Sequence, residues 1–189
     1  MTFLGRSMAG EDVLEVEEAY RGKLISLLKY HVSANGRRTV REVVKHPGAV
    51  AIIPVKEDGK IVLVKQHRLP AGRSLVEIPA GTKRNNEEDE ECARRELLEE
   101  TGYRASVFRK IRSFYLAPGY STEKITLFLA SGLEKTEQRL DEDENIDVLE
   151  TSPREVFKML CEGAIEDAKT IIGVYELMER LGEEALQIG

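Results

Sequence analysis

Three glutamates, Glu96, Glu99 and Glu100, have the residue type and spacing best suited to chemistry in this sequence. On a helix, residues three and four positions apart share a face, so the three carboxylates would lie together. Like charges at this spacing destabilise an isolated helix, and the helix dipole disfavours anions near a C-terminus. We therefore expect a compensating cation, and carboxylate oxygens favour Mg²⁺ or Mn²⁺ over zinc. If these acidic residues are considered without the surrounding sequence, the alternative is that they form a solvated helix face paired with arginines.

The acid run belongs to a longer pattern of 23 residues, from Gly81 to Tyr103. This pattern resembles the Nudix family, whose signature is a loop, a helix and a second loop. All nine fixed positions of the signature are present: Gly81, Glu87, Arg95, Glu96, Leu97, Glu99, Glu100, Gly102 and Tyr103.

The resemblance implies a role for each position. Glu96 and Glu100 would be the main metal ligands, and the carbonyl of Ala80 would complete the metal shell. Glu99 would lie close behind, as a ligand and a catalytic carboxylate. Arg95 and Glu87 would brace the two loops against the helix rather than touch the substrate.

The resemblance also implies a cofactor of two or three divalent ions, Mg²⁺ with Mn²⁺ as a substitute. Such ions neutralise pyrophosphate oxygens and lower the pKa of a bound water. They would also resolve a conflict in the composition, because clusters of acidic residues otherwise repel a phosphate-bearing substrate. These clusters lie at residues 87–91, 96–100 and 141–144.

The segment from Leu116 to Glu123 follows the signature and contains Pro118 and Gly119. It resembles the proline-containing loop of the ADP-ribose pyrophosphatase subfamily, with Ala117 where those proteins usually have serine. Pro118 and Gly119 are therefore expected to bind substrate. A simple turn between two strands is the alternative interpretation.

Arg41 and Arg68 are candidates for holding the pyrophosphate, because a guanidinium can bond two oxygens at once. Arg41 opens a segment that resembles the entry to the catalytic domain in that subfamily. Arg68 is the last residue of a Gln-X-Arg sequence that resembles one in the subfamily, where the arginine binds phosphate. A strand-end arginine that merely faces solvent is the alternative for each.

Glu144 is the favoured base for activating water, because it lies just before an apolar strand in a segment that resembles the subfamily's acidic catalytic loop. A base on a loop can close over the site when substrate binds. Glu142 and Glu123 are the other candidates, and a solvated acid run is the alternative.

The apolar patterns predict strands followed by helices, and hence an α+β or layered α/β domain. Residues 1–15 show no periodicity and are expected to be an extended or partly disordered lead-in. Two hairpins are predicted, one through Asn35-Gly36 and one through residues 57–60. The other expected elements are strands at 75–78, 107–115, 125–130 and 146–150, and helices at 88–101, from Ser152 onward and at 166–181.

The resemblance covers roughly residues 17–181 and implies a Nudix α/β/α sandwich with a small N-terminal β region. The expected division is residues 1–46 for the β region, which would pack across a homodimer, and 47–189 for the Nudix hydrolase domain. Arg41 would then reach the site of the partner subunit.

The net charge of −6 and a pI near 5.3 argue against binding nucleic acid, which normally requires a basic face. The two cysteines are too few for a disulfide framework, so a reducing cytoplasm is expected. The sequence lacks an apolar run of membrane length, which predicts a soluble protein with no membrane partner.

The leading functional hypothesis is Mg²⁺-dependent hydrolysis of ADP-ribose to AMP and ribose 5-phosphate. Another nucleoside diphosphate sugar or nucleotide is the enzymatic alternative. A non-catalytic Nudix module that binds nucleotides is a third hypothesis, although such modules typically lose signature carboxylates that this chain retains.

Overall fold

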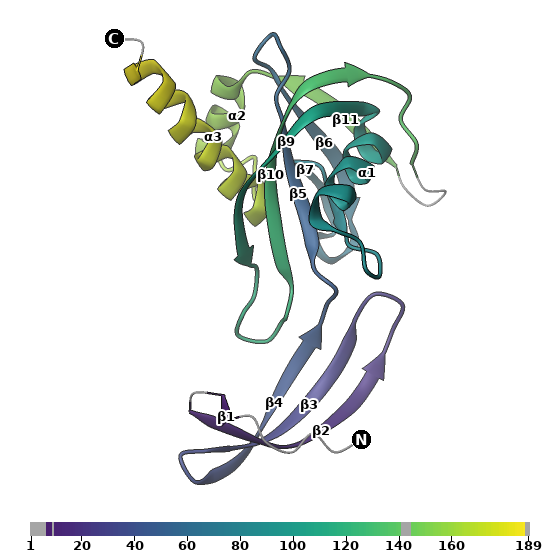
Figure 1. Ribbon diagram of the computed structural model, residues 1–189, viewed down its shortest axis with the longest axis vertical. Helices are drawn as coiled ribbons and strands as arrows, with labels where there is room; N and C mark the ends of the chain where they lie inside the picture. The colour runs from purple at the N-terminus through teal and green to yellow at the C-terminus, as the bar shows by residue number, and fades with distance from the viewer. Residues whose placement is uncertain (1–6, 9, 141–144, 188–189) are drawn as a thin grey trace. The chain divides into compact units, whose positions relative to one another are not determined.

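The computed structural model of the chain describes residues 7–8, 10–140 and 145–187. The chain forms two compact units, the first from residues 1–48 and 115–124, the second from 49–114 and 125–189. Each unit has its own sheets, as Figure 1 shows.

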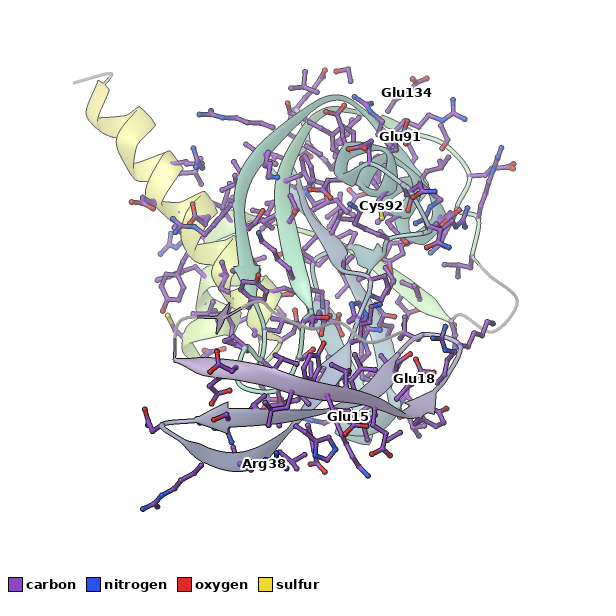
Figure 2. The ribbon with its side chains drawn as sticks, turned by 60° about the horizontal axis from the view of Figure 1, so that its bottom comes forward. Glu15, Glu18, Arg38, Glu91, Cys92 and Glu134 are labelled. Carbon is purple, nitrogen blue, oxygen red and sulfur yellow. The ribbon has the colours of Figure 1, made fainter. Side chains whose placement is uncertain are left out.

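The first unit is built on a four-stranded antiparallel sheet in the order β1-β2-β3-β4. Charged side chains, among them Glu15, Glu18 and Arg38, are exposed on its strands (Figure 2). The strands are β1 (Ser7–Met8), β2 (Glu11–Arg21), β3 (Ser26–Ala34) and β4 (Arg37–Lys45).

The predicted first hairpin is confirmed as β3 and β4, which pair from Ser26 with Lys45 to Ala34 with Arg37. Asn35 and Gly36 form the turn with φ of 50° and 74°. Two consecutive positive φ angles are what a tight hairpin turn requires, and they favour the Asn-Gly pair.

The expectation for residues 1–15 needs correction at residues 7–8 and 11–15, which form β1 and the start of β2 and are therefore paired in a sheet. β2 pairs with β3 from Glu11 to Arg21. Most of its residues are exposed and many are acidic, so it lacks the apolar alternation by which a half-buried strand is recognised in a sequence.

The second unit contains two sheets, with strand orders β8-β5-β10-β9 and β11-β6-β7, and three helices. Its elements are β5 (Ala49–Pro54), β6 (Ile61–Arg68), the 3₁₀ turn η1 (Leu69–Ala71), β7 (Arg73–Glu77), β8 (Ala80–Thr82), α1 (Asp89–Thr101), β9 (Tyr103–Tyr115), β10 (Lys124–Lys135), β11 (Ile146–Thr151), α2 (Pro153–Cys161) and α3 (Ala168–Gln187).

β5 is buried on both faces and separates two apolar cores. Ala49, Ala51 and Ile53 pack with residues of α2 and α3, whereas Val50 and Ile52 pack with α1. This alternation follows from the two-residue period of a strand. Helices therefore cover both faces of the sheets (Figure 1), and the predicted α/β/α sandwich is confirmed.

The second predicted hairpin is wrong. β5 pairs with β8 and, in parallel, with β10, whereas β6 pairs with β11 and β7. Only one bridge, between Val55 and Ile61, joins the two strands beyond the turn. β5 and the first half of β6 are apolar and buried on both faces, so partners distant in sequence can take the edges that a hairpin would use.

Candidate active site

α1 carries the glutamates, and local signals set both of its ends. Glu88 is the N-cap and forms a capping box with Glu91, while Gly102 ends the helix with φ of 68°. Cys92 is fully buried toward the sheet, and its neighbour Glu91 is exposed (Figure 2). The helix predicted at 88–101 is thus confirmed to within one residue.

Glu96 and Glu100 are buried, with 9% and 3% of their surfaces exposed, and both lie against the backbone of β8. The amide of Ala80 donates a 3.0 Å hydrogen bond to Glu100 Oε2. A Cβ on Gly81 would lie 1.9 Å from the Glu96 carboxyl carbon. The structure therefore brings together Ala80, Glu96 and Glu100, three of the four predicted metal ligands.

Arg95 lies beside the carboxylate face. Its Nη1 donates to Glu96 Oε1 at 2.6 Å and to Glu99 Oε2 at 2.9 Å. Glu99, the fourth predicted ligand, is also 3.6 Å from Arg84 Nη2. Part of the positive charge that the clustered carboxylates require thus comes from arginine, as the alternative interpretation of the acid run expected.

Arg95 also braces the loop before the helix, as the resemblance implied. Its Nε and Nη2 donate to the two oxygens of Glu87 at 2.8 and 2.9 Å, and Nη2 reaches the Thr82 carbonyl at 3.2 Å. The bond from Arg95 lowers the pKa of Glu87 to about 2, aided by the backbone amide of Arg84. The same pairing raises the pKa of Arg95.

Arg68, at the end of β6, forms a bidentate ion pair with Glu77 at the end of β7, with both bonds 2.7 Å long. This pairing raises the pKa of Arg68 most, and the charge of Glu100 adds to the effect. Arg68 is therefore within electrostatic reach of the carboxylate helix. Lys169 on α3 contacts Glu77 as well.

Sequence reasoning missed Glu77 and Lys169. Glu77 could have been noticed as a charge inside the apolar run from Leu75 to Ile78, where an ionised group must find a partner. Gln66, the first residue of the Gln-X-Arg match, was given no role of its own, and its buried Nε2 has no hydrogen-bond partner within the described residues. No sequence signal marks Lys169, which lies in the first turn of an ordinary amphipathic helix.

The other predicted substrate-binding residues belong to the first unit. Arg41 on β4 pairs with Glu11, with the shorter contact 2.6 Å. Pro118 and Gly119 lie in the loop between β9 and β10. That loop is fastened to β4 by hydrogen bonds between Val44 and residues 120 and 122, of 2.7 and 3.0 Å.

Glu144 and Glu142 lie outside the described residues. Glu123, the remaining candidate base, is half-buried, and its amide donates to Ser121 Oγ at 3.1 Å.

Within residues 7–8, 10–140 and 145–187, no three Asp, Glu, His or Cys side chains form a group that could hold a metal ion. The donors around β8 still fit a hard cation in kind, because two buried carboxylates lie beside the Ala80 and Gly81 backbone. No helix in the described part of the chain is long and apolar enough to cross a membrane.

The sequence profile of the NUDIX domain matches residues 45–172. The chain is 43% identical over 180 residues to an ADP-ribose pyrophosphatase from Bacillus subtilis (strain 168), covering 94% of this chain and 96% of the relative. It is 41% identical over 170 residues to a methanol dehydrogenase activator from Bacillus methanolicus, covering 88% and 92%.

A solved structure described as an ADP compounds hydrolase superposes with a TM-score of 0.82 at 22% identity, covering 95% of this chain and 98% of that one. That likeness bears on the fold alone. The domain profile spans more than half of the sequence, and its signature helix forms the site just described. The chain therefore belongs to the Nudix hydrolase family.

Proposed function

We propose that this protein hydrolyses the pyrophosphate of ADP-ribose, with Mg²⁺, to AMP and ribose 5-phosphate. The observation that carries the substrate is the 43% identity, over 94% of the chain, to an ADP-ribose pyrophosphatase. The buried carboxylates on α1 carry the reaction class, because pyrophosphate cleavage needs cations that only such ligands hold well.

In this proposal Glu96, Glu99, Glu100 and the carbonyl of Ala80 hold two or three divalent ions. When bound, the metal supplies Lewis-acid stabilisation of the phosphate oxygens and a more acidic water. Arg95 keeps Glu96 and Glu99 on one side of the helix through its paired Nη1 contacts. Arg68, which is already held by Glu77, binds a phosphate oxygen of the substrate.

Arg41, Pro118 and Gly119 are proposed to complete substrate binding, and Glu144 to take the proton from the attacking water. Replacing each of Glu144, Glu142 and Glu123 by glutamine tests the base. Glu144→Gln should reduce kcat by orders of magnitude. If Glu142→Gln or Glu123→Gln reduces kcat by as much or more, that glutamate is the base instead.

The substrate is tested by phosphate release in the presence of a phosphatase. ADP-ribose has no terminal phosphate, so only its hydrolysis products, which are phosphate monoesters, yield inorganic phosphate. A panel of nucleotide sugars should give the highest kcat/KM for ADP-ribose. A value for GDP-mannose as high as that for ADP-ribose would disprove the substrate assignment. EDTA should abolish the reaction, and Mg²⁺ or Mn²⁺ should restore it.

Glu100→Gln distinguishes a catalyst from a nucleotide-binding module. A catalyst should lose activity by orders of magnitude, since a buried ligand carboxylate is gone. Glu90→Gln is the matched control, because Glu90 lies on the same helix but is exposed and pairs with Arg94. Nucleotide binding without turnover in the wild-type chain would favour the module.

The identity to a methanol dehydrogenase activator favours a second candidate function, the activation of a dehydrogenase. Adding the protein to a purified methanol dehydrogenase and measuring the dehydrogenase rate tests it. If the protein hydrolyses ADP-ribose but leaves the dehydrogenase rate unchanged, the second function is excluded and the first stands.

We further propose that the protein acts as a homodimer in the cytoplasm, with residues 1–46 packing between subunits. Sedimentation equilibrium should give twice the chain mass, and removal of residues 1–46 should give a monomer. A monomeric full-length chain would contradict this.

A further inference from the structure

Glu77 is a carboxylate with 1% of its surface exposed, and it binds two cations from different elements. Arg68 Nε and Nη2 each donate to it at 2.7 Å, and Lys169 Nζ lies 2.5 Å from Oε2. Burying charge is costly, and packed apolar side chains often stabilise a fold as well as a buried ion pair does. Stability alone therefore does not explain why these three groups meet.

The start of α3 fixes Lys169. Asp167 precedes the helix, its Oδ2 accepts the Thr170 amide at 2.9 Å, and its Oδ1 lies 3.0 Å from Lys169 Nζ. Thr170 Oγ1 in turn accepts the amide of Ile78, the residue after Glu77, at 2.9 Å. Glu77 is thus held from its side chain and from the adjacent backbone, which gives it little freedom to move.

The bidentate pair uses one side of the Arg68 guanidinium, the edge formed by Nε and Nη2. A guanidinium has five N–H donors, so Nη1 and the outer hydrogen of Nη2 remain for another partner. Within the described residues, the side-chain hydrogen bonds of Arg68 go to Glu77 alone, and 39% of its side chain is exposed. The outer edge of the fork has the spacing that suits two phosphate oxygens.

Lys169 decides the charge of this arrangement. An arginine paired with one glutamate has no net charge and would attract an anion weakly. Asp167 adds a second negative charge, because it lies 3.0 Å from Lys169 Nζ and its charge also acts on Arg68. Without Lys169, the carboxylates of Glu77 and Asp167 would outweigh Arg68, and with Lys169 the four charges balance. A phosphate near the outer edge of Arg68 would therefore meet the guanidinium without a net negative charge behind it.

We propose that Glu77 is a positioning residue for substrate binding, and that Lys169 offsets the negative charge that Glu77 and Asp167 would otherwise place behind Arg68. In this arrangement Glu77 fixes the Arg68 guanidinium so that its outer edge faces the pyrophosphate. The inference rests on the proposed function, in which Arg68 binds a phosphate of ADP-ribose. It adds two residues, one on β7 and one on α3, that act through Arg68 rather than by touching the substrate.

The test compares KM and kcat for ADP-ribose in Glu77→Gln, Lys169→Met, Arg68→Ala and the double variant Glu77→Gln/Arg68→Ala. Glu77→Gln and Lys169→Met should each raise KM by about 10-fold and change kcat by less than about threefold, since ground-state binding is lost. The double variant should raise KM no further than Arg68→Ala, because Glu77 acts only through that arginine.

Glu77→Asp covers the case in which Glu77→Gln fails to fold. It keeps the charge that pairs with both cations but draws the carboxylate back by one methylene. KM should rise while the melting temperature stays close to that of the wild type. Glu176→Gln is the matched control: Glu176 is a carboxylate on α3, 10% exposed and paired with Arg112, and its loss should leave KM unchanged.

Two results would overturn the inference while the proposed function stands. One is a KM within twofold of wild type in both Glu77 variants of an enzyme that hydrolyses ADP-ribose. The other is a double variant whose KM increase equals the product of the single increases. A wild-type protein that does not hydrolyse ADP-ribose would overturn the proposed function, and this inference with it.

Discussion

Gly81 has no side chain, and the space that a Cβ would occupy is filled by the carboxyl of Glu96. The glycine of the signature is therefore explained by a close approach: Glu96 can lie against β8 only if residue 81 lacks a Cβ. The backbone conformation of Gly81 does not require glycine, because its φ is not positive.

Gly81→Ala should lower kcat for ADP-ribose by about 100-fold, because a displacement of about 1 Å at a reacting centre can cost that much. Phosphatase-coupled assays measure the loss, and circular dichroism should show an intact fold. Gly182→Ala is the control, since a Cβ there meets nothing within 4 Å. Full activity in Gly81→Ala would show that Glu96 does not need its present position.

The two cysteines differ in reactivity for a physical reason. Cys92 is fully buried, and burial raises the pKa of its thiol to about 12, whereas Cys161 is exposed. The thiolate is the reactive form, so Cys92 should resist alkylation. Iodoacetamide at neutral pH should modify the native protein once, at Cys161, as peptide mass spectrometry would show. Modification of Cys92 without denaturant would contradict its burial.

At the scale of elements, the C-terminus of α1 is closed by the end of β10 and by the segment beyond it. Gln138 Nε2 donates to the Glu100 carbonyl at 2.6 Å, and Lys135 Nζ to the Thr101 carbonyl at 3.2 Å. These bonds satisfy carbonyls that have no partner within the helix. They also place a positive charge at the helix end that carries the carboxylates.

Gly102→Ala should destabilise the fold by roughly 1–3 kcal/mol, more than a positive φ alone would cost. The φ of 68° disfavours alanine, and its Cβ would also lie 2.7 Å from the Gln138 amide nitrogen. Gly59→Ala is the matched control, with φ of 77° and open space around the Cβ. Urea unfolding measures the loss in the free energy of unfolding for both variants. Equal losses would show that residues 136–138 shift to accommodate the Cβ at little cost.

At the scale of the whole molecule, paired carboxylates should make stability fall in acid. Arg95 lowers the pKa of Glu87 from 4.5 to about 2. Burial alone would raise the pKa of Glu77, but the bonds and charges of Arg68 and Lys169 outweigh it and hold the pKa below its ordinary value. A depressed pKa in the folded state stabilises the fold above pH 4.5, and that contribution is lost as the pH falls toward 2.

The melting temperature should therefore drop between about pH 5 and pH 2.5, and Glu87→Gln should make that drop smaller. Differential scanning calorimetry at several pH values measures it. Glu42→Gln, which replaces an exposed carboxylate on β4, should leave the slope unchanged. An identical slope in Glu87→Gln and the wild type would show that Glu87 does not contribute.

The sequence by itself determined the features that depend on neighbours along the chain. Helix spacing placed Glu96 and Glu100 on one face, Gly102 ended α1, and Asn35-Gly36 formed the first hairpin turn. These features follow from dihedral preferences and fixed periodicities, which a single sequence displays directly.

The tertiary structure alone decided which distant segments meet. β5 and β6 separate into different sheets, because β10 and β11 bind their edges. Glu77 pairs with Lys169 across 92 positions and with Arg68 across nine. The packing of a strand against a helix brings these buried ions together, and the sequence around either residue does not predict its partner.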